Sequence, residues 1–303
     1  MEEAMKDFSN KIAVVTGGAS GIGRSLVRQL AEAGCHVAMC DVSEERITES
    51  RDLAMQTAAL GVKVTTFKAD VSKRKQVEAF RDHVLQKHET DHIHLLINNA
   101  GMTGSGSFVK DPEDEWQRVF DVCWGGVYNN TRAFLPALKK APVARIVNVS
   151  SANGFFASVG PGMPHTSYSA AKFAVKGFTE ALIEDLRVNA PNVQASVVMP
   201  GHVGTRILEH SVESGGRHVP EKMRKNLKQF TDLFVAMGLR PEQAAEIILS
   251  GVREGKWRIL VGADAEAMDR AVRETPELAY TKEFWKERIA PVLPGAAGLK
   301  RSQ

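Results

Sequence analysis

Short apolar runs alternate with longer segments of helical periodicity along most of the chain. Ile12–Val15 and Ile146–Val149 are continuous and rich in β-branched residues, which is typical of strands buried on both faces. Seven runs of this kind occur, in the stretches KIAVVT, CHVAMCD, VKVTTF, LLIN, ARIVNVS, VQASVVMP and RILVG. Strands that alternate with helices predict an α/β fold with one doubly wound, Rossmann-type parallel sheet of seven strands.

The spacing of apolar residues predicts helices over 21–33, 116–139, 173–187 and 241–254. Two further segments do not fit the simple alternation. Residues 206–239 separate the last two strands, where an open α/β sheet needs only a short connection, and we expect a substrate lid there. Residues 264–303 predict an amphipathic helix, a shorter helix and a frayed tail. The expected organisation is one domain over residues 1–263 with a C-terminal helical extension.

Composition and charge narrow the class of protein. The net charge is +3 and the charged residues are interspersed, so the concentrated basic face that nucleic-acid binding needs is not expected. No run approaches the ~18 apolar residues of a membrane span, and the start of the chain is acidic and polar, unlike a secretory signal. The 3 cysteines have no CxxC spacing, which favours a reducing compartment over a disulfide or zinc framework. We therefore expect a cytoplasmic protein without a metal site.

A glycine-rich turn, TGGASGIG, follows the first predicted strand and opens a helix, where N–H groups and the helix dipole can meet a pyrophosphate. The strict G-x-G-x-x-G pattern is not met, since Leu26 stands where the third glycine would be. A plain strand-to-helix turn is the alternative interpretation. The residues of the turn expected to contact a dinucleotide are Gly17, Ser20, Gly21, Ile22 and Gly23.

Asp41 ends the second predicted strand close to the offset, about 20 residues, at which a carboxylate accepts from a ribose 2′-hydroxyl. A 2′-phosphate would be repelled there. No arginine or lysine follows until Arg46, so NAD is the expected cofactor and NADP is disfavoured. The alternative role for Asp41 is a cap for the helix that begins near Ser43.

Tyr168 and Lys172 lie one helical turn apart on the same face of a predicted helix, so both side chains project toward the same volume. A phenol ionises near pH ~10, but a neighbouring ammonium stabilises the phenolate and lowers its pKa. Tyr168 could thereby act as a general acid or base, and Lys172 could also donate to the ribose of the nicotinamide half. Such a pair arises by chance in many helices and is persuasive only together with other motifs.

Other candidate residues follow predicted strands at the carboxyl edge of the sheet, where open α/β folds bind ligands. Ser150 and Ser151 follow the fifth strand, and a serine hydroxyl there can donate to a carbonyl oxygen or accept from an alcohol. Asn98 and Asn99 are equally consistent with bonding to neighbouring backbone. The remaining residues expected to line the cofactor cleft are Asp70, Val71, Asn99, Ala100, Gly101, Pro200, Gly201, Val203 and Thr205.

Taken in order, TGGASGIG, NNAG, Ser151, YSAAK and MPGHVGT resemble the short-chain dehydrogenase/reductase family over roughly residues 9–262. The resemblance implies an alcohol dehydrogenase or ketone reductase that transfers hydride between NAD(H) and a secondary alcohol or ketone. It implies that Tyr168 is the proton donor or acceptor, that Lys172 anchors the ribose and modulates the phenol, and that Ser151 orients the substrate. A homodimer or homotetramer is also implied.

The chain departs from the family pattern at two places. The segment between Ser151 and Tyr168 is longer than usual, so the loop FFASVGPGMPH is expected to enlarge or cover the pocket. Cys123 stands where the family usually has an asparagine that completes a water relay to the lysine, and a thiol is a poorer hydrogen-bond partner than an amide. Either a backbone carbonyl and water carry the relay without it, or turnover is slow, or the physiological reaction differs. We expect activity to survive.

Apolar residues near the expected site favour a bulky apolar or aromatic substrate, although the same residues could pack the lid onto the sheet. They are Phe155, Phe156, Met163, Met223, Phe230, Phe234 and Met237. Two other functions stay open. The chain could be an NADPH-dependent carbonyl reductase, which Asp41 disfavours, or a non-catalytic NADH-binding regulatory protein, with Cys123 as the trace of lost turnover.

Overall fold

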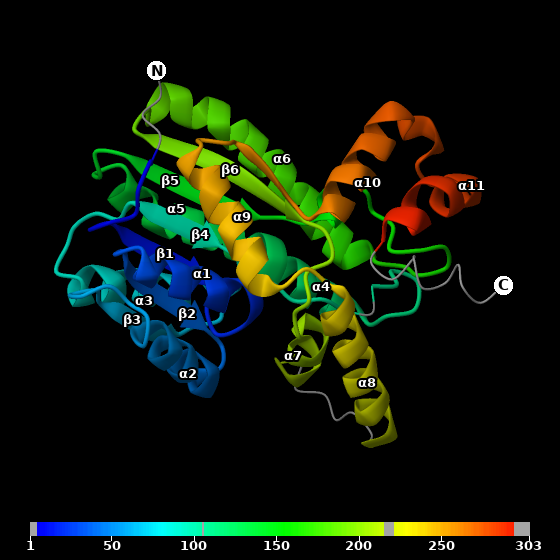
Figure 1. Ribbon diagram of the computed structural model, residues 1–303, viewed down its shortest axis with the longest axis horizontal. Coiled ribbons are helices and arrows are strands. Elements are labelled where there is room, and N and C mark those ends of the chain that lie inside the picture. Colours follow the sequence, from blue (N-terminus) through cyan, green and yellow to red (C-terminus); the bar gives the residue numbers. More distant parts are fainter. Residues whose placement is uncertain (1–4, 105, 215–220, 294–303) are drawn as a thin grey trace.

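The computed structural model describes residues 5–104, 106–214 and 221–293, and it contains one parallel sheet between two layers of helices (Figure 1). The strands are β1 (Ile12–Thr16), β2 (His36–Asp41), β3 (Val64–Lys68), β4 (Leu95–Asn98), β5 (Ala144–Val149), β6 (Val193–Pro200) and β7 (Arg258–Val261). Their order in the sheet is β3-β2-β1-β4-β5-β6-β7. This confirms the predicted seven-stranded Rossmann-type fold.

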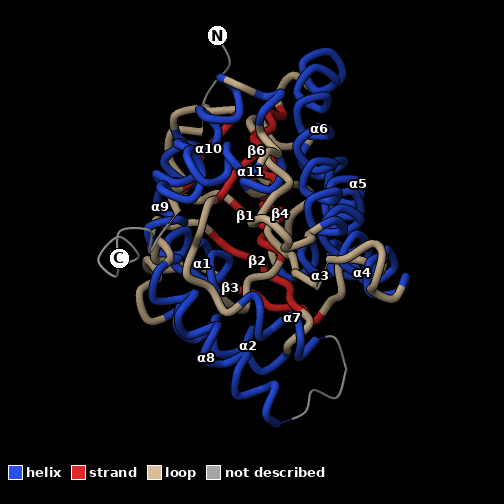
Figure 2. Tube along the Cα trace, turned by 90° about the vertical axis from the view of Figure 1, so that its right-hand side faces the viewer, coloured by secondary structure: helices blue, strands red, loops and turns tan. Residues whose placement is uncertain are grey.

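Helices cover both faces of the sheet. One layer consists of α1 (Gly21–Glu32), α2 (Glu44–Met55) and α9 (Pro241–Arg253). The other consists of α3 (Arg74–Lys87), α5 (Gly126–Leu138) and α6 (Thr166–Asn189), as the view in Figure 2 shows. Strand β1 explains the continuous apolar runs of the sequence. Ala13 and Val15 are buried under the first layer, whereas Ile12 and Val14 are buried under the second, so both sides of the strand must be apolar.

The predicted helix over 116–139 is present, and it contains a π-helical turn that the sequence-based expectation did not include. It comprises α4 (Glu113–Phe120), a π-helical turn (Asp121–Gly125) and α5. Just beyond the turn, a Cβ at Gly126 would lie 2.6 Å from Cγ2 of Val71, so the glycine permits a close approach of α5 to the loop after β3. Apolar periodicity alone does not reveal a single extra residue in a helix.

The segment between β6 and α9 forms two helices, α7 (Ile207–Ser214) and α8 (Glu221–Met237). Its ends are joined at the base, because the Gly204 N–H donates to the Leu239 carbonyl at 2.8 Å and the Leu239 N–H donates to the His202 carbonyl at 2.9 Å. The described residues 206–214 and 221–239 therefore project from the sheet together, with α7 and α8 side by side (Figure 1).

The described residues after β7 include α10 (Ala263–Glu274), α11 (Lys282–Phe284) and a π-helical turn (Trp285–Ile289), which belong to the expected C-terminal extension. It has its own apolar cluster, and Phe156 is only 1% exposed within it, stacked on Tyr280 and Trp285. Phe156 thus packs the extension onto the body of the protein. The expected frayed tail lies outside the described residues. Across the described ranges, no helix is both long and apolar enough to span a membrane.

Candidate active site

A cavity of about 240 Å³ opens at the carboxyl edge of the sheet, beside the point where the chain order switches between β1 and β4. Residues from five strand ends and from α6 meet there. The predicted site residues that line it are Gly17, Ser20, Gly21, Ile22, Asp41, Asn99, Ala100, Gly101, Ser151, Tyr168, Lys172, Pro200, Gly201, Val203 and Thr205. Motifs that are far apart in the sequence therefore share one cleft.

Three predicted cofactor residues lie elsewhere. Asp70 and Val71 line an adjacent cavity, which shares Gly17 and Asp41 with the first. Gly23 lines neither cavity, and a Cβ at that position would overlap the carbonyl oxygen of Gly17. The contact of Gly23 with a dinucleotide stays a prediction, while the structure shows that this glycine permits the close packing of α1 against the turn.

The glycine-rich turn is fixed to the end of β4. Gly17 has φ +67°, in the left-handed region that favours glycine, and a Cβ there would lie 2.8 Å from Cα of Ala100. The side-chain amide of Asn99 donates to the carbonyls of Thr16 at 3.0 Å and Gly17 at 3.2 Å. The Thr16 hydroxyl in turn accepts from the N–H groups of Asn99 and Ala100, both at 3.0 Å. These bonds hold the N-terminus of α1 toward the cavity, a geometry suited to an anion.

Asp41 joins the glycine turn to α2. Its carboxylate accepts from the Ala19 N–H at 3.3 Å and from the Ser43 N–H at 3.2 Å. The cap of α2 is Ser43, whose hydroxyl accepts from the Arg46 N–H at 3.3 Å. The capping role considered for Asp41 thus belongs to Ser43, while Asp41 lines both cavities.

The two adjacent serines have different environments. Ser150 is buried, and its hydroxyl donates to the Lys172 carbonyl at 2.7 Å, which ties β5 to α6. Ser151 is half-buried and accepts from the Asn153 N–H at 3.1 Å, and its interaction with the Tyr168 phenol acts to lower the pKa of that phenol. Of the pair, Ser151 is the hydroxyl that meets the phenol.

Tyr168 and Lys172 face each other across the first turns of α6. The Lys172 ammonium lies 5.4 Å from the centre of the Tyr168 ring and donates to the Val149 carbonyl at 2.9 Å. Burial raises the pKa of Tyr168 above its ordinary value, and the charge of Lys172 and the hydrogen bond of Ser151 only partly offset this. The expected lowering is right for the Lys172 interaction but wrong for the net direction, because desolvation of the phenolate outweighs it.

Cys123 lies in the π-helical turn and is fully buried. Its thiol donates to the Met102 carbonyl at 3.2 Å and accepts from the Met102 N–H at 3.5 Å. Both interactions hold the loop after β4, and neither is directed at Lys172. The ammonium instead has the Val149 carbonyl, so a backbone group supplies the hydrogen bond on that side.

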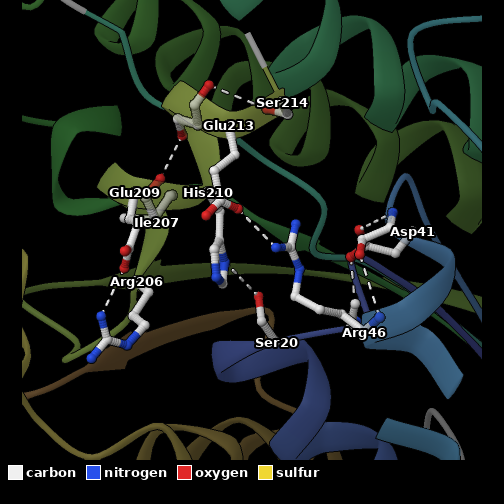
Figure 3. Close-up of polar contacts among 12 residues, drawn as sticks. Ser20, Asp41, Arg46, Arg206, Ile207, Glu209, His210, Glu213 and Ser214 are labelled. Carbon is white, nitrogen blue, oxygen red and sulfur yellow. Dashed lines mark hydrogen bonds and ion pairs between the residues drawn. The ribbon is translucent and has the colours of Figure 1, made fainter. Parts of the chain in front are cut away.

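Sequence reasoning missed the contribution of α7 to the cleft. Ile207, His210, Ser211 and Ser214 line the cavity from this helix. His210 Nδ1 lies 3.3 Å from the Ser20 hydroxyl, directly above the glycine turn (Figure 3). Positions 207, 210, 211 and 214 are separated by three or four residues, and this spacing was an available signal because it places them on one helical face.

The apolar residues predicted near the pocket are dispersed. Phe234 lines the cavity and packs at a tilt of 38° against His202, with the ring centres 4.0 Å apart. Phe230 and Met163 are 59% and 57% exposed, and Met237 is also exposed. Phe155 packs against the apolar cluster of the C-terminal extension. The side chain of Met223 lies outside the described residues.

The chain resembles known proteins along most of its length. The model of the short chain dehydrogenase family matches residues 11–215. The oxidoreductase SadH of Mycobacterium tuberculosis is 36% identical over 269 residues, which cover 89% of this chain and 92% of SadH. The 3-oxoacyl-[acyl-carrier-protein] reductase FabG of Thermotoga maritima is 30% identical over 242 residues, 80% of this chain and 90% of its own. The structure of a short chain dehydrogenase/reductase from Burkholderia phymatum, in complex with NAD, superposes with a TM-score of 0.78 at 28% identity, covering 90% of this chain and 96% of that one.

Proposed function

This chain belongs to the short-chain dehydrogenase/reductase family of NAD(P)-binding oxidoreductases, and from that premise we propose that it transfers hydride between NAD(H) and a secondary alcohol or ketone. The observation that carries the proposal is the meeting of Ser151, Tyr168 and Lys172 in the cavity that the glycine turn also lines. A phenol, a hydroxyl and an ammonium in one cleft are the groups needed to exchange a proton with a substrate oxygen.

The residues of the cleft fit a dinucleotide. Gly17 and Gly21 have positive φ and leave the turn without side chains where a pyrophosphate would approach, and the N-terminus of α1 faces the same space. Asp41 is placed to accept from a ribose hydroxyl, and Lys172 to donate to one. A bound nicotinamide supplies or accepts the hydride.

In the direction of ketone reduction, the Tyr168 phenol gives its proton to the carbonyl oxygen as negative charge develops on it. The Ser151 hydroxyl donates to the same oxygen and holds it near the phenol. In alcohol oxidation, the Tyr168 phenolate takes the hydroxyl proton, and the Lys172 ammonium stabilises that phenolate. Asn99, Pro200, Gly201, Val203 and Thr205 would line the nicotinamide side.

The support for NAD over NADP is the carboxylate of Asp41, which stands where a 2′-phosphate would add charge of the same sign. The support for a bulky apolar or aromatic substrate is the set of apolar side chains that line the cavity around the motif residues, which are Val42, Met102, Val149, Ile207 and Phe234. Residues 206–239 would act as the lid, since both α7 and α8 contribute to the lining.

A spectrophotometric assay tests this function. Absorbance at the nicotinamide band is followed with NAD and, separately, NADP against aliphatic, aromatic and steroidal alcohols, with the Tyr168→Phe variant as control. NAD-dependent turnover that disappears in the variant supports the proposal, and a preference for NADP makes the chain an NADPH-dependent carbonyl reductase. Binding of NADH without turnover on any substrate favours the regulatory alternative, in which Cys123 marks the lost activity.

Two properties of the whole protein complete the proposal. We expect a cytoplasmic enzyme, because Cys35, Cys40 and Cys123 are all buried free thiols. We also expect a homodimer or homotetramer, with half-exposed aromatic residues such as Tyr128 on α5 and Phe173 on α6 at the contact between copies. Light scattering after size exclusion tests the second point, and a monomer at all concentrations contradicts it.

A further inference from the structure

We propose that Glu213 is a second determinant of cofactor choice, which keeps the Arg46 guanidinium from serving a 2′-phosphate and so favours NAD over NADP. The inference rests on the proposed function, because it takes Asp41 to face the adenosine ribose. It concerns two residues that are 167 positions apart in the sequence and that the cofactor motifs do not include.

Arg46 is the cation best placed to recognise a phosphate on that ribose. It lies in the first turns of α2 and lines both the main cavity and the adjacent one, together with Asp41 in each. Among the described residues that line these cavities, Arg46 is the one arginine or lysine common to both. A guanidinium binds phosphate through two parallel N–H donors, so an unoccupied Arg46 would oppose the selectivity that Asp41 provides.

The Arg46 guanidinium forms an ion pair with the carboxylate of Glu213. Arg46 Nη1 lies 2.8 Å from Oε2 of Glu213, which extends from α7 toward α2 and lines the adjacent cavity (Figure 3). The side chains are 28% and 51% exposed, so the pair is within reach of solvent but its arginine is largely covered. A pair exposed to this degree adds little to the free energy of unfolding. Its importance is that Glu213 occupies N–H donors of Arg46 that could otherwise bind a phosphate.

The position of Glu213 is set by other contacts of α7. The Ser211 hydroxyl accepts from the Thr103 N–H at 2.9 Å, and Arg118 donates to the Ser214 carbonyl. His210 lies against Ser20 on the opposite part of the helix. These contacts hold α7 beside α2, so the backbone of Glu213 stands where its carboxylate can reach Arg46.

The charges decide the expected direction. Asp41, Arg46 and Glu213 together carry one net negative charge, which repels a 2′-phosphate of about −2 but leaves a 2′-hydroxyl almost unaffected. With a neutral residue at position 213 the three positions carry no net charge, and the guanidinium has free donors. Removing the Glu213 charge from this partly exposed site is expected to change the affinity for NADPH by about tenfold.

Dissociation constants of NADH and NADPH, measured by fluorescence titration, test the inference without requiring turnover. Glu213→Gln should strengthen NADPH binding about tenfold while NADH binding stays within about twofold. Glu209→Gln is the matched control, since Glu209 lies on the same helix but pairs with Arg206 at 2.7 Å. The gain should disappear in the Glu213→Gln/Arg46→Ala double variant.

An unchanged ratio of the two affinities in Glu213→Gln overturns the inference, as does a gain that survives the removal of Arg46. Asp41→Asn separates this failure from that of the proposed function. If Asp41→Asn improves NADPH binding and Glu213→Gln does not, only the role of Glu213 is wrong. If neither variant changes the ratio, Asp41 does not face the ribose, and both the NAD assignment and this inference fail.

Discussion

The cleft has two walls of different construction. One is the carboxyl edge of the sheet with the start of α6, where Lys172 and Ser150 are buried and bonded to neighbouring backbone. The other is α7 with part of α8, which reaches the cleft through side-chain contacts such as those of His210 and Glu213. The reacting groups lie on the first wall, at the edge of the sheet, and the residues that cover the cleft lie on the second, formed by α7 and α8. This division lets chemistry stay fixed while recognition varies.

The largest effect is expected for Tyr168→Phe, a substitution on the wall formed by the sheet edge and α6. Removal of the phenol oxygen should lower turnover by about 10²- to 10⁴-fold, because no other described group that lines the cavity combines a hydroxyl with the Lys172 ammonium beside it. NADH affinity should change little, since the ring remains. Steady-state kinetics and NADH titration measure the two effects, and a variant that keeps more than a tenth of the activity contradicts the assignment.

A second test concerns the packing of α1 against the glycine turn. Gly23→Ala places a Cβ against the Gly17 carbonyl, so the turn must shift, at a cost of about 2 kcal/mol in the free energy of unfolding. Gly177→Ala is the matched control, because nothing lies within 4 Å of its added Cβ and alanine favours the helix. Urea titration should show destabilisation for the first and none for the second. Equal stability of the two variants contradicts the packing role.

The pH dependence tests the buried phenol. Oxidation needs the phenolate, and because burial raises the pKa of Tyr168, the phenolate is a minor form at neutral pH. The oxidation rate should therefore increase from pH 6 to 9, by up to about tenfold per pH unit. Ketone reduction needs the protonated phenol, which persists over this range, so its rate should stay nearly flat. An oxidation rate that is level across the range indicates a phenol pKa below it.

The smallest effect is expected at the π-helical turn. Cys123→Ala should keep turnover within about fivefold of wild type, because Lys172 donates its hydrogen bond to the Val149 carbonyl and the Cys123 thiol bonds Met102. If the wild-type protein reduces no carbonyl and Cys123→Asn restores turnover, the prediction that activity survives without the asparagine is wrong. Stopped-flow or steady-state assays of the three proteins decide between these outcomes.

The sequence by itself determined the sheet, the glycine turn and the face shared by Tyr168 and Lys172. Each depends on local features: uninterrupted apolar runs for strands with two buried sides, glycines where φ is positive, and the helical period that aligns positions one turn apart. Local patterns of this kind survive in the sequence because neighbouring residues alone satisfy them.

Only the tertiary structure decided that the Ser150 hydroxyl is buried against the Lys172 carbonyl, that Phe156 packs the C-terminal extension, and that Arg46 pairs with Glu213. It also decided the net direction of the Tyr168 pKa. These outcomes depend on which distant segments come together and how much water they exclude. Desolvation and long-range pairing have no period along the chain, so they become defined only when the folded molecule brings those segments into contact.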